Sequence, residues 1–123
     1  MAEKKQKFNA VPTIIDGIRF ASKAEGQYYL FLKAEKEAGR IRDFKRQQRL
    51  EIIPKHKKFG KPVAARSYIA DFIVTRLDGE EEIIDVKGFE TKEFKLKKVF
   101  FEYLNPEKSI KIVSAKDIKG WSV

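Results

Sequence analysis

The 123-residue chain contains no cysteine, which excludes disulfide bonds and thiolate zinc sites and suits a reducing cytoplasm. It has one histidine, His56, which lies among lysines with no companion metal ligand beside it, so we interpret it as a surface or phosphate-contacting residue. No apolar run approaches the ~20 residues of a membrane-spanning helix. The basic start, Met1 to Lys7, is not followed by an apolar stretch and therefore does not have the pattern of a secretory signal.

Positive charge is abundant and unevenly distributed. The net charge is +9, from 27 basic and 18 acidic residues, and this length predicts a single domain over residues 1–123 with a basic N-terminal arm at 1–10. Between Arg40 and Arg66 there are ten basic residues against Asp43 and Glu51. Concentrated positive charge on a small domain favours a nucleic-acid partner. The alternatives are a solvated basic surface and, less favoured because no basic amphipathic helix carries the charge, an acidic membrane.

Turn residues, capping residues and hydrophobic periodicity divide the chain into a series of elements. In chain order we expect a hairpin at 11–20, a helix from Ser22 to Gly39, a strand at 41–53, an exposed, flexible basic loop at 54–65, strands around 68–72 and 84–88, a helix at 91–104 and a strand at 109–114. This order predicts an α/β fold with a central mixed β-sheet flanked by helices.

Some positions within these elements have a specific interpretation. In the helix at 91–104 the spacing of Leu96, Val99, Phe100, Tyr103 and Leu104 predicts the buried stripe. The even positions of the strand at 41–53 form an apolar face that also carries Arg46 and Gln48. A glutamine on such a face needs partners, either a water or substrate near an active site or an ordinary buried hydrogen bond.

Two strand-like segments carry the residues with the clearest chemistry. Asp71 lies in Tyr-Ile-Ala-Asp-Phe, and Asp85 and Lys87 lie in Ile-Asp-Val-Lys, with a turn through Asp78-Gly79 between the segments. Because side chains alternate along a strand, Asp85 and Lys87 share a face while Ile84 and Val86 occupy the other. Two carboxylates and an ammonium would then meet at one place, where carboxylates could bind a divalent cation and the lysine could hold a water. The alternative is a salt-bridged edge strand.

Glu25 also has two interpretations. It follows Ser22 by three residues, as in a capping box, and could therefore cap the helix or act as a ligand.

With Glu25, Asp71, Asp85 and Lys87 in this order, residues 20–115 resemble the PD-(D/E)XK nuclease superfamily, in which a helix bearing a glutamate precedes a strand meander with an aspartate and a D/E-x-K motif. The segments Phe-Ala-Ser-Lys-Ala-Glu, Tyr-Ile-Ala-Asp-Phe and Asp-Val-Lys-Gly are similar to those of a small phage and prophage endonuclease family related to Holliday-junction resolvases. The residue before Asp71 is alanine, where proline is frequent in this superfamily.

The resemblance implies a restriction-endonuclease-like core and a Mg²⁺-dependent DNA endonuclease acting on branched DNA in the bacterial host cytoplasm, with Mn²⁺ able to substitute. It implies that Glu25, Asp71, Asp85 and the Val86 carbonyl bind the metal ion, and that Lys87 lies next to the attacking water. By analogy with symmetric cleavage we expect a homodimer. The alternative is a non-catalytic nucleic-acid-binding protein on the same fold. The residues that we expect to contact DNA are Arg42, Arg46, Gln48, Arg49, Lys55, Lys57, Lys58, Lys61, Lys95 and Lys98.

Overall fold

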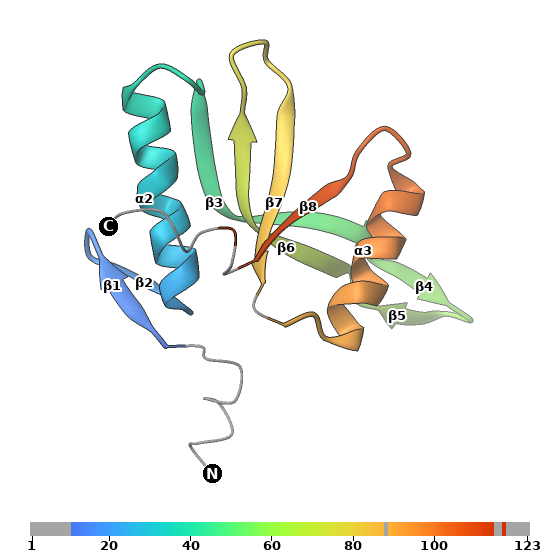
Figure 1. Ribbon diagram of the computed structural model, residues 1–123. Coiled ribbons are helices and arrows are strands. Elements are labelled where there is room, and N and C mark those ends of the chain that lie inside the picture. Colours follow the sequence, from blue (N-terminus) through green and yellow to red (C-terminus); the bar gives the residue numbers. More distant parts are fainter. Residues whose placement is uncertain (1–10, 88, 115–116, 118–123) are drawn as a thin grey trace.

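The computed structural model describes residues 11–87, 89–114 and 117, so the expected N-terminal arm and Gly88 lie outside the described residues. A four-stranded sheet with strand order β3-β6-β7-β8 forms its centre (Figure 1). β3 (Asp43–Ile53), β6 (Arg66–Thr75) and β7 (Glu81–Lys87) pair antiparallel, and β8 (Ile110–Ser114) is parallel to β7. With the helices α2 (Lys23–Glu37) and α3 (Lys92–Leu104), this arrangement confirms the predicted α/β fold with a central mixed sheet.

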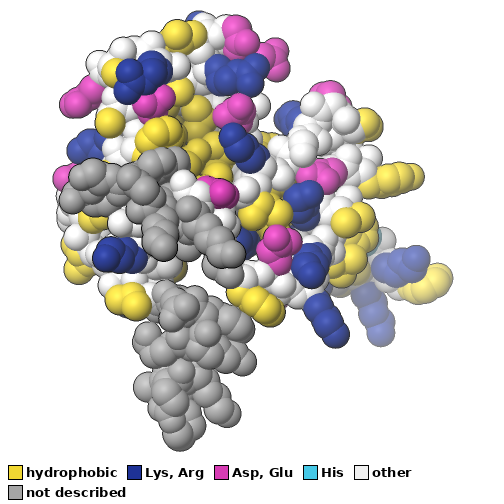
Figure 2. All heavy atoms as spheres, in the orientation of Figure 1, with side chains coloured by type: hydrophobic (Ala, Val, Ile, Leu, Met, Phe, Trp, Pro, Cys, Tyr) yellow, Lys and Arg dark blue, Asp and Glu magenta, His cyan; other side chains and the backbone are white. Residues whose placement is uncertain are grey.

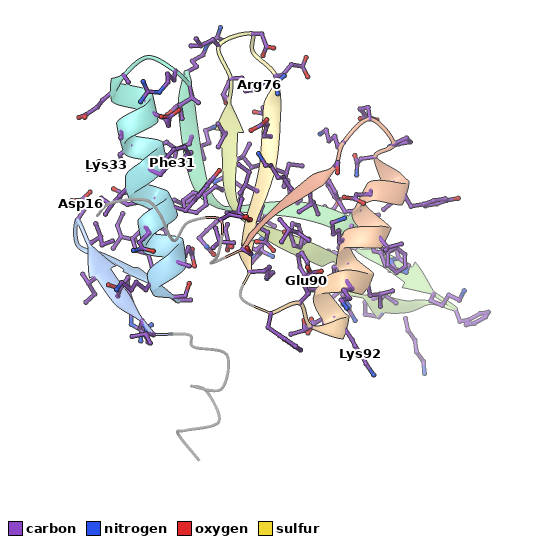
Figure 3. The ribbon with its side chains drawn as sticks, viewed as in Figure 1. Asp16, Phe31, Lys33, Arg76, Glu90 and Lys92 are labelled. Atoms are coloured by element: carbon purple, nitrogen blue, oxygen red, sulfur yellow. The ribbon has the colours of Figure 1, made fainter. Side chains whose placement is uncertain are left out.

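The first hairpin, of β1 (Thr13–Ile15) and β2 (Ile18–Phe20), forms as predicted. Its turn residues Asp16 and Gly17 have φ values of 56° and 76°, both positive as a type I′ turn requires. The Asp16 carboxylate accepts hydrogen bonds from Lys33 Nζ at 2.6 Å and Tyr29 Oη at 2.8 Å, and Figure 3 shows Lys33 near the turn. These contacts fix the hairpin to α2.

Helix α2 begins and ends close to the predicted residues. Ser22 is the N-cap, and its side chain accepts a hydrogen bond from Glu25 N at 3.1 Å. Gly39, with φ of 77°, follows the C-cap. Near the start of the helix, a Cβ on Gly26 would lie 2.9 Å from side-chain atoms of both Thr13 and Ile15, so only glycine allows this close packing on β1.

Helix α3 buries a different face from the predicted one. Its stripe of Leu96, Val99, Phe100, Tyr103 and Leu104 is 42–80% exposed, so that prediction was wrong. The sheet instead receives Phe94 and Phe101, which are one heptad apart and pack their rings against Tyr68. Periodicity failed here because apolar residues occur on two faces of the helix, and two large aromatic rings suffice to fill the space above the sheet.

Two groups of buried residues lie on opposite faces of β7. Ile84 packs with α2 residues and with Phe72, whereas Ile83 packs with Phe94 and Phe101 of α3. Figure 1 shows β3 and β6 bending sharply near their middles. The bend coincides with Gln47, whose φ of 51° is uncommon for a non-glycine residue and which lies between two regular pairs of the β3–β6 ladder.

Residues 54–65 are exposed as predicted, but the predicted irregular loop is wrong. β4 (His56–Lys58) and β5 (Lys61–Val63) form a two-stranded hairpin that projects from the distal ends of β3 and β6 (Figure 1). Pro54 and Pro62 suggested a break, yet a two-stranded ribbon consists of edge strands, where proline is tolerated. The turn is Phe59-Gly60, a pair outside the usual Asn-Gly and Asp-Gly signals. Among the described residues, no helix has both the length and the apolar character needed to cross a membrane.

Candidate active site

Asp71 and Asp85 lie side by side on neighbouring strands. The β6–β7 ladder pairs Phe72 with Ile84, and Asp71 and Asp85 are the residues next to this pair on the two strands. Asp71 N lies 3.4 Å from Asp85 Oδ1, and Val86 N donates to Asp71 Oδ2 at 2.8 Å. The predicted turn through Asp78-Gly79 therefore brings both carboxylates to the same point of the sheet.

Lys87 shares the face of Asp85, as the strand alternation predicts. Its Nζ lies 3.1 Å from Asp85 Oδ2 and 4.4 Å from the ring centroid of Phe94, so an ion pair and a cation–π contact hold the ammonium. Asp85 is 1% exposed, whereas the Lys87 side chain is 28% exposed and remains accessible from solvent. Ile84 and Val86 pack on the opposite side, against the α2 core.

Glu25 approaches the aspartates from helix α2. Its backbone N–H completes half of a capping box, and its buried carboxylate accepts a hydrogen bond from Gln47 Nε2 at 3.2 Å and lies 4.0 Å from Arg46 Nη2. Arg46 in turn stacks over the Phe20 ring at 4.6 Å. The carboxylate also accepts a hydrogen bond from the backbone of Ala21 at the start of the helix. The side chain of Glu25 thus contacts both the helix start and the bend in β3, and its role as a ligand stays a prediction.

Two buried oxygen atoms of the site have no well-aligned hydrogen bond. Asp85 Oδ2 is ion-paired with Lys87 Nζ at 3.1 Å, and neither it nor Tyr68 Oη has a hydrogen-bond partner of good geometry among the described residues. Burial, the charge of Asp85 and a hydroxyl–carboxylate interaction with Asp85 raise the pKa of Tyr68, which keeps its hydroxyl protonated. Buried oxygen atoms of this kind can bind a further ligand.

The site concentrates negative charge away from water. Desolvation raises the pKa of Asp71 to about 8, with further contributions from the charges of Asp85 and Glu25. Desolvation also raises the pKa of Glu25, against the lowering effect of Arg46. In the part of the chain that the structure describes, these three carboxylates have two cationic ion-pair partners, Arg46 and Lys87, so a bound cation would relieve the excess negative charge.

The chemistry of the donor set, carboxylate oxygens, fits a hard divalent cation. The described residues hold no group of three or more Asp, Glu, His or Cys side chains already arranged around one metal position. Mg²⁺ is commonly held by one or two carboxylates and waters, and here Asp71 and Asp85 provide two adjacent carboxylates, of which Asp85 Oδ2 has no hydrogen bond among the described residues. The predicted ligand roles of Glu25 and of the Val86 carbonyl remain predictions.

The residues expected to contact DNA fall into two groups. Some are engaged within the molecule: Arg42 donates to Leu77 O, Arg46 pairs with Glu25, Gln48 donates to Arg46 O, and Lys98 pairs with Glu102. Gln48 therefore has the ordinary hydrogen bond, and its role near the carboxylates stays a prediction. The other group is exposed, and dark-blue side chains gather at the lower right of Figure 2, toward the β4–β5 hairpin. This exposed group consists of Arg49, Lys55, Lys57, Lys58, Lys61 and Lys95.

Two residues of the site were not found from the sequence. Gln47 reaches Glu25 at a bend of β3 where its own φ is positive, and no local sequence pattern predicts that conformation. Tyr68 looks like a core aromatic, and its pairing partner across β6 and β3 is Leu50. The three-residue interval between Tyr68 and Asp71 puts the two residues on opposite faces of an ideal strand, so only the sheet geometry brings the hydroxyl toward Asp85.

Searches of curated proteins and of solved structures find no match to this chain. A family model matches residues 5–120, which is almost the whole sequence. The chain therefore belongs to the family described as "Protein of unknown function (DUF1064)".

Proposed function

We propose that this protein is a metal-dependent DNA endonuclease of the PD-(D/E)XK type, with Mg²⁺ as its cofactor and Mn²⁺ as a substitute. The observation that carries the proposal is the pair of adjacent buried aspartates with Lys87 Nζ at 3.1 Å from Asp85 Oδ2, an oxygen that has no hydrogen bond among the described residues. Glu25 adds a third carboxylate from α2, in agreement with the order of residues in the sequence motif.

The chain's own groups have distinct roles in this proposal. Asp71 and Asp85 would hold the cation, and Val86 N–H would keep the Asp71 carboxylate in place. Lys87 is partly exposed and would orient the attacking water and offset the charge that develops on the phosphate. The cation, when bound, supplies a Lewis acid for the phosphate and lowers the pKa of the water. Gln47 and Arg46 would position Glu25.

The substrate that we infer is branched or recombination-intermediate DNA, acted on in a bacterial cytoplasm by a phage-type enzyme. The excess of basic residues between Arg40 and Arg66 supports a polyanionic partner, and the exposed lysines of the β4–β5 hairpin are available to contact phosphates. The choice of branched DNA rests on the sequence resemblance.

The experiment that tests this function is a cleavage panel. Labelled duplex, single-stranded, flap and four-way DNA are incubated with the protein in Mg²⁺, in Mn²⁺ and in EDTA, and metal binding is measured by isothermal titration. We expect cation binding and cation-dependent cuts, most on branched substrates. Binding of DNA without metal binding or cutting would instead favour the non-catalytic nucleic-acid-binding protein.

We also infer that two copies associate through the exposed face of α3. Leu96, Val99, Phe100 and Tyr103 are spaced symmetrically about the point between Val99 and Phe100, so an antiparallel contact about a two-fold axis would pair Leu96 with Tyr103 and Val99 with Phe100. With Leu104 they expose on the order of 500 Å² of mostly apolar surface, compared with ~800 Å² per partner in a standard interface.

Sedimentation analysis tests this association with Val99→Glu, which places a charge in the middle of the contact. We expect a dimer for the unmodified protein and a folded monomer for the variant. The matched control is Leu77→Glu, an exposed leucine in the β6–β7 turn that should leave the dimer intact. Equal masses for the unmodified protein and Val99→Glu would contradict the assignment.

A further inference from the structure

The tip of the β4–β5 hairpin carries an aromatic side chain that is exposed to solvent. Phe59 is 93% exposed, the highest value among the exposed large hydrophobic residues of the described chain. It lies at the first turn position between Lys58 and Lys61, which pair with each other across the two strands. Figure 1 shows this hairpin projecting away from the helices and the central sheet. The ring therefore adds nothing to the hydrophobic core.

The backbone at the tip is also unfavourable for phenylalanine. Phe59 has φ of 50° and Gly60 has φ of 75°, the two positive values of a type I′ turn. Asn, Asp and Gly adopt the first of these positions readily, whereas a bulky residue there is strained. Phe59 thus lowers stability through strain and gains none from burial. Such strained, exposed positions indicate contact with a partner.

The charge around the ring identifies the chemistry of the partner. Residues 54–66 contain four lysines, one arginine and one histidine but no acidic residue. Lys58 Nζ lies 5.4 Å from the Phe59 ring centroid, so the charge and the aromatic face are presented together. A nucleic acid offers both complements, phosphates for the lysines and flat base surfaces for the ring. A lipid surface is less favoured, because one ring buries far less apolar area than an interfacial helix.

We propose that Phe59 stacks on, or wedges beside, unpaired bases of the DNA that the lysines of the hairpin hold by its phosphates. This inference rests on the proposed endonuclease function and specifies the substrate as DNA with bases accessible outside the stack. The tip is at most about 40 Å of extended strand from Asp71, counting twelve residues from Phe59 at ~3.3 Å each. That reach corresponds to little more than about one turn of duplex, at ~3.4 Å per base along a strand. The hairpin would therefore select for a branch or distortion near the cut.

Phe59→Asn is the most informative variant, because Asn-Gly is the preferred pair for this turn and the substitution removes the ring while favouring the hairpin. Binding is measured by fluorescence anisotropy in EDTA, so that no cleavage occurs, on a paired duplex and on the same duplex with three unpaired bases, at several salt concentrations. We expect unchanged or higher thermal stability, and affinity for the unpaired substrate that is roughly 5- to 150-fold weaker, the range for loss of one base–aromatic stack. The paired duplex should bind as before.

A double lysine variant and a control variant separate the contribution of the Phe59 ring to DNA binding from that of the lysine charges. Lys57→Ala with Lys61→Ala should weaken binding to both substrates and flatten the dependence of log affinity on log salt, by up to ~0.9 for each phosphate that is no longer neutralised. Phe59→Asn should leave that slope unchanged. The control is Leu77→Ala, an exposed apolar residue in the β6–β7 turn, which should alter neither binding nor slope.

Equal affinities of Phe59→Asn and the unmodified protein for the unpaired substrate would overturn the inference, as would equal losses on both substrates. Binding of anionic vesicles that depends on Phe59, without such a dependence for DNA, would overturn it in favour of a membrane. Because these measurements are made without a divalent cation, they are independent of cleavage. A protein that shows the Phe59 effect but never cuts DNA would refute the endonuclease and leave base stacking in place.

Discussion

Substitution of Asp71 by asparagine should stabilise the metal-free protein above pH 5. The pKa of Asp71 is about 8 in the folded protein against an ordinary 3.8, because the carboxylate is desolvated and faces Asp85 and Glu25. A carboxyl with a raised pKa favours folding when it is protonated. Its contribution is therefore fully present below about pH 4 and is lost as the pH rises through 8. Asparagine does not ionise and can still accept the hydrogen bond from Val86 N.

The expected change in the free energy of unfolding follows from the difference between the pKa of about 8 in the folded protein and the ordinary pKa of 3.8, at ~1.4 kcal/mol for each tenfold change in proton affinity. The difference in unfolding free energy between Asp71→Asn and the unmodified protein should be near zero at pH 4, of order 4 kcal/mol at pH 7 and largest above pH 8. At pH 7 this corresponds to a rise in Tm on the order of 10 °C. Mg²⁺ should raise the Tm of the unmodified protein and leave that of Asp71→Asn almost unchanged.

The assay is thermal and urea unfolding at pH 4, 5, 7 and 9 in EDTA and then in Mg²⁺. Asp78→Asn is the matched control, because Asp78 is exposed and its pKa is lowered by a hydrogen bond from Glu80 N and by Arg76. Its stability contribution is present above about pH 4, so its loss should not stabilise the protein at any pH. A pH-independent difference for Asp71→Asn, or a loss of stability at pH 8, would refute the reasoning.

Two other substitutions test the separate roles of the lysine and the glutamate. Lys87→Ala should slow cleavage by ~10²- to 10⁴-fold with little change in DNA affinity, measured by single-turnover kinetics and anisotropy; equal losses of both would make Lys87 a phosphate-binding residue. Glu25→Gln keeps an acceptor for Gln47 and removes a buried charge, so we expect native-like thermal stability with strongly reduced metal-dependent activity. A Glu25→Gln protein with native-like stability and full activity would instead support the capping role, because glutamine can also complete a capping box.

Local signals in the sequence predicted most of the elements and their pairing. Asp16-Gly17 and Asp78-Gly79 specify tight turns, and Ser22 marks a helix start, because these residues act through their own backbone and nearest neighbours. Alternation along β7 correctly put Asp85 and Lys87 on one face. These features require no knowledge of distant contacts.

The errors all involve features that depend on tertiary structure. The buried face of α3 is decided by the sheet, which receives Phe94 and Phe101 and leaves the apolar stripe exposed. The β4–β5 hairpin has a turn whose residues do not favour it, so composition indicated a loop. Gln47 reaches Glu25 through an unusual backbone conformation in the middle of a strand. Sequence patterns describe average backbone geometry, and these positions depart from it.

The measurement that tests the central claim most directly compares Asp85→Asn with the unmodified protein in a cleavage assay. Asp85 is buried between Asp71 and Lys87, and asparagine has nearly the same shape without the charge. Both proteins are incubated with labelled four-way and duplex DNA in Mg²⁺, and DNA binding is measured in parallel. We predict that the unmodified protein cuts only with the cation, and that Asp85→Asn binds DNA equally or more tightly but does not cut. Cleavage by Asp85→Asn at the unmodified rate, or no cleavage of any substrate by the unmodified protein in Mg²⁺ or Mn²⁺, would contradict the assignment.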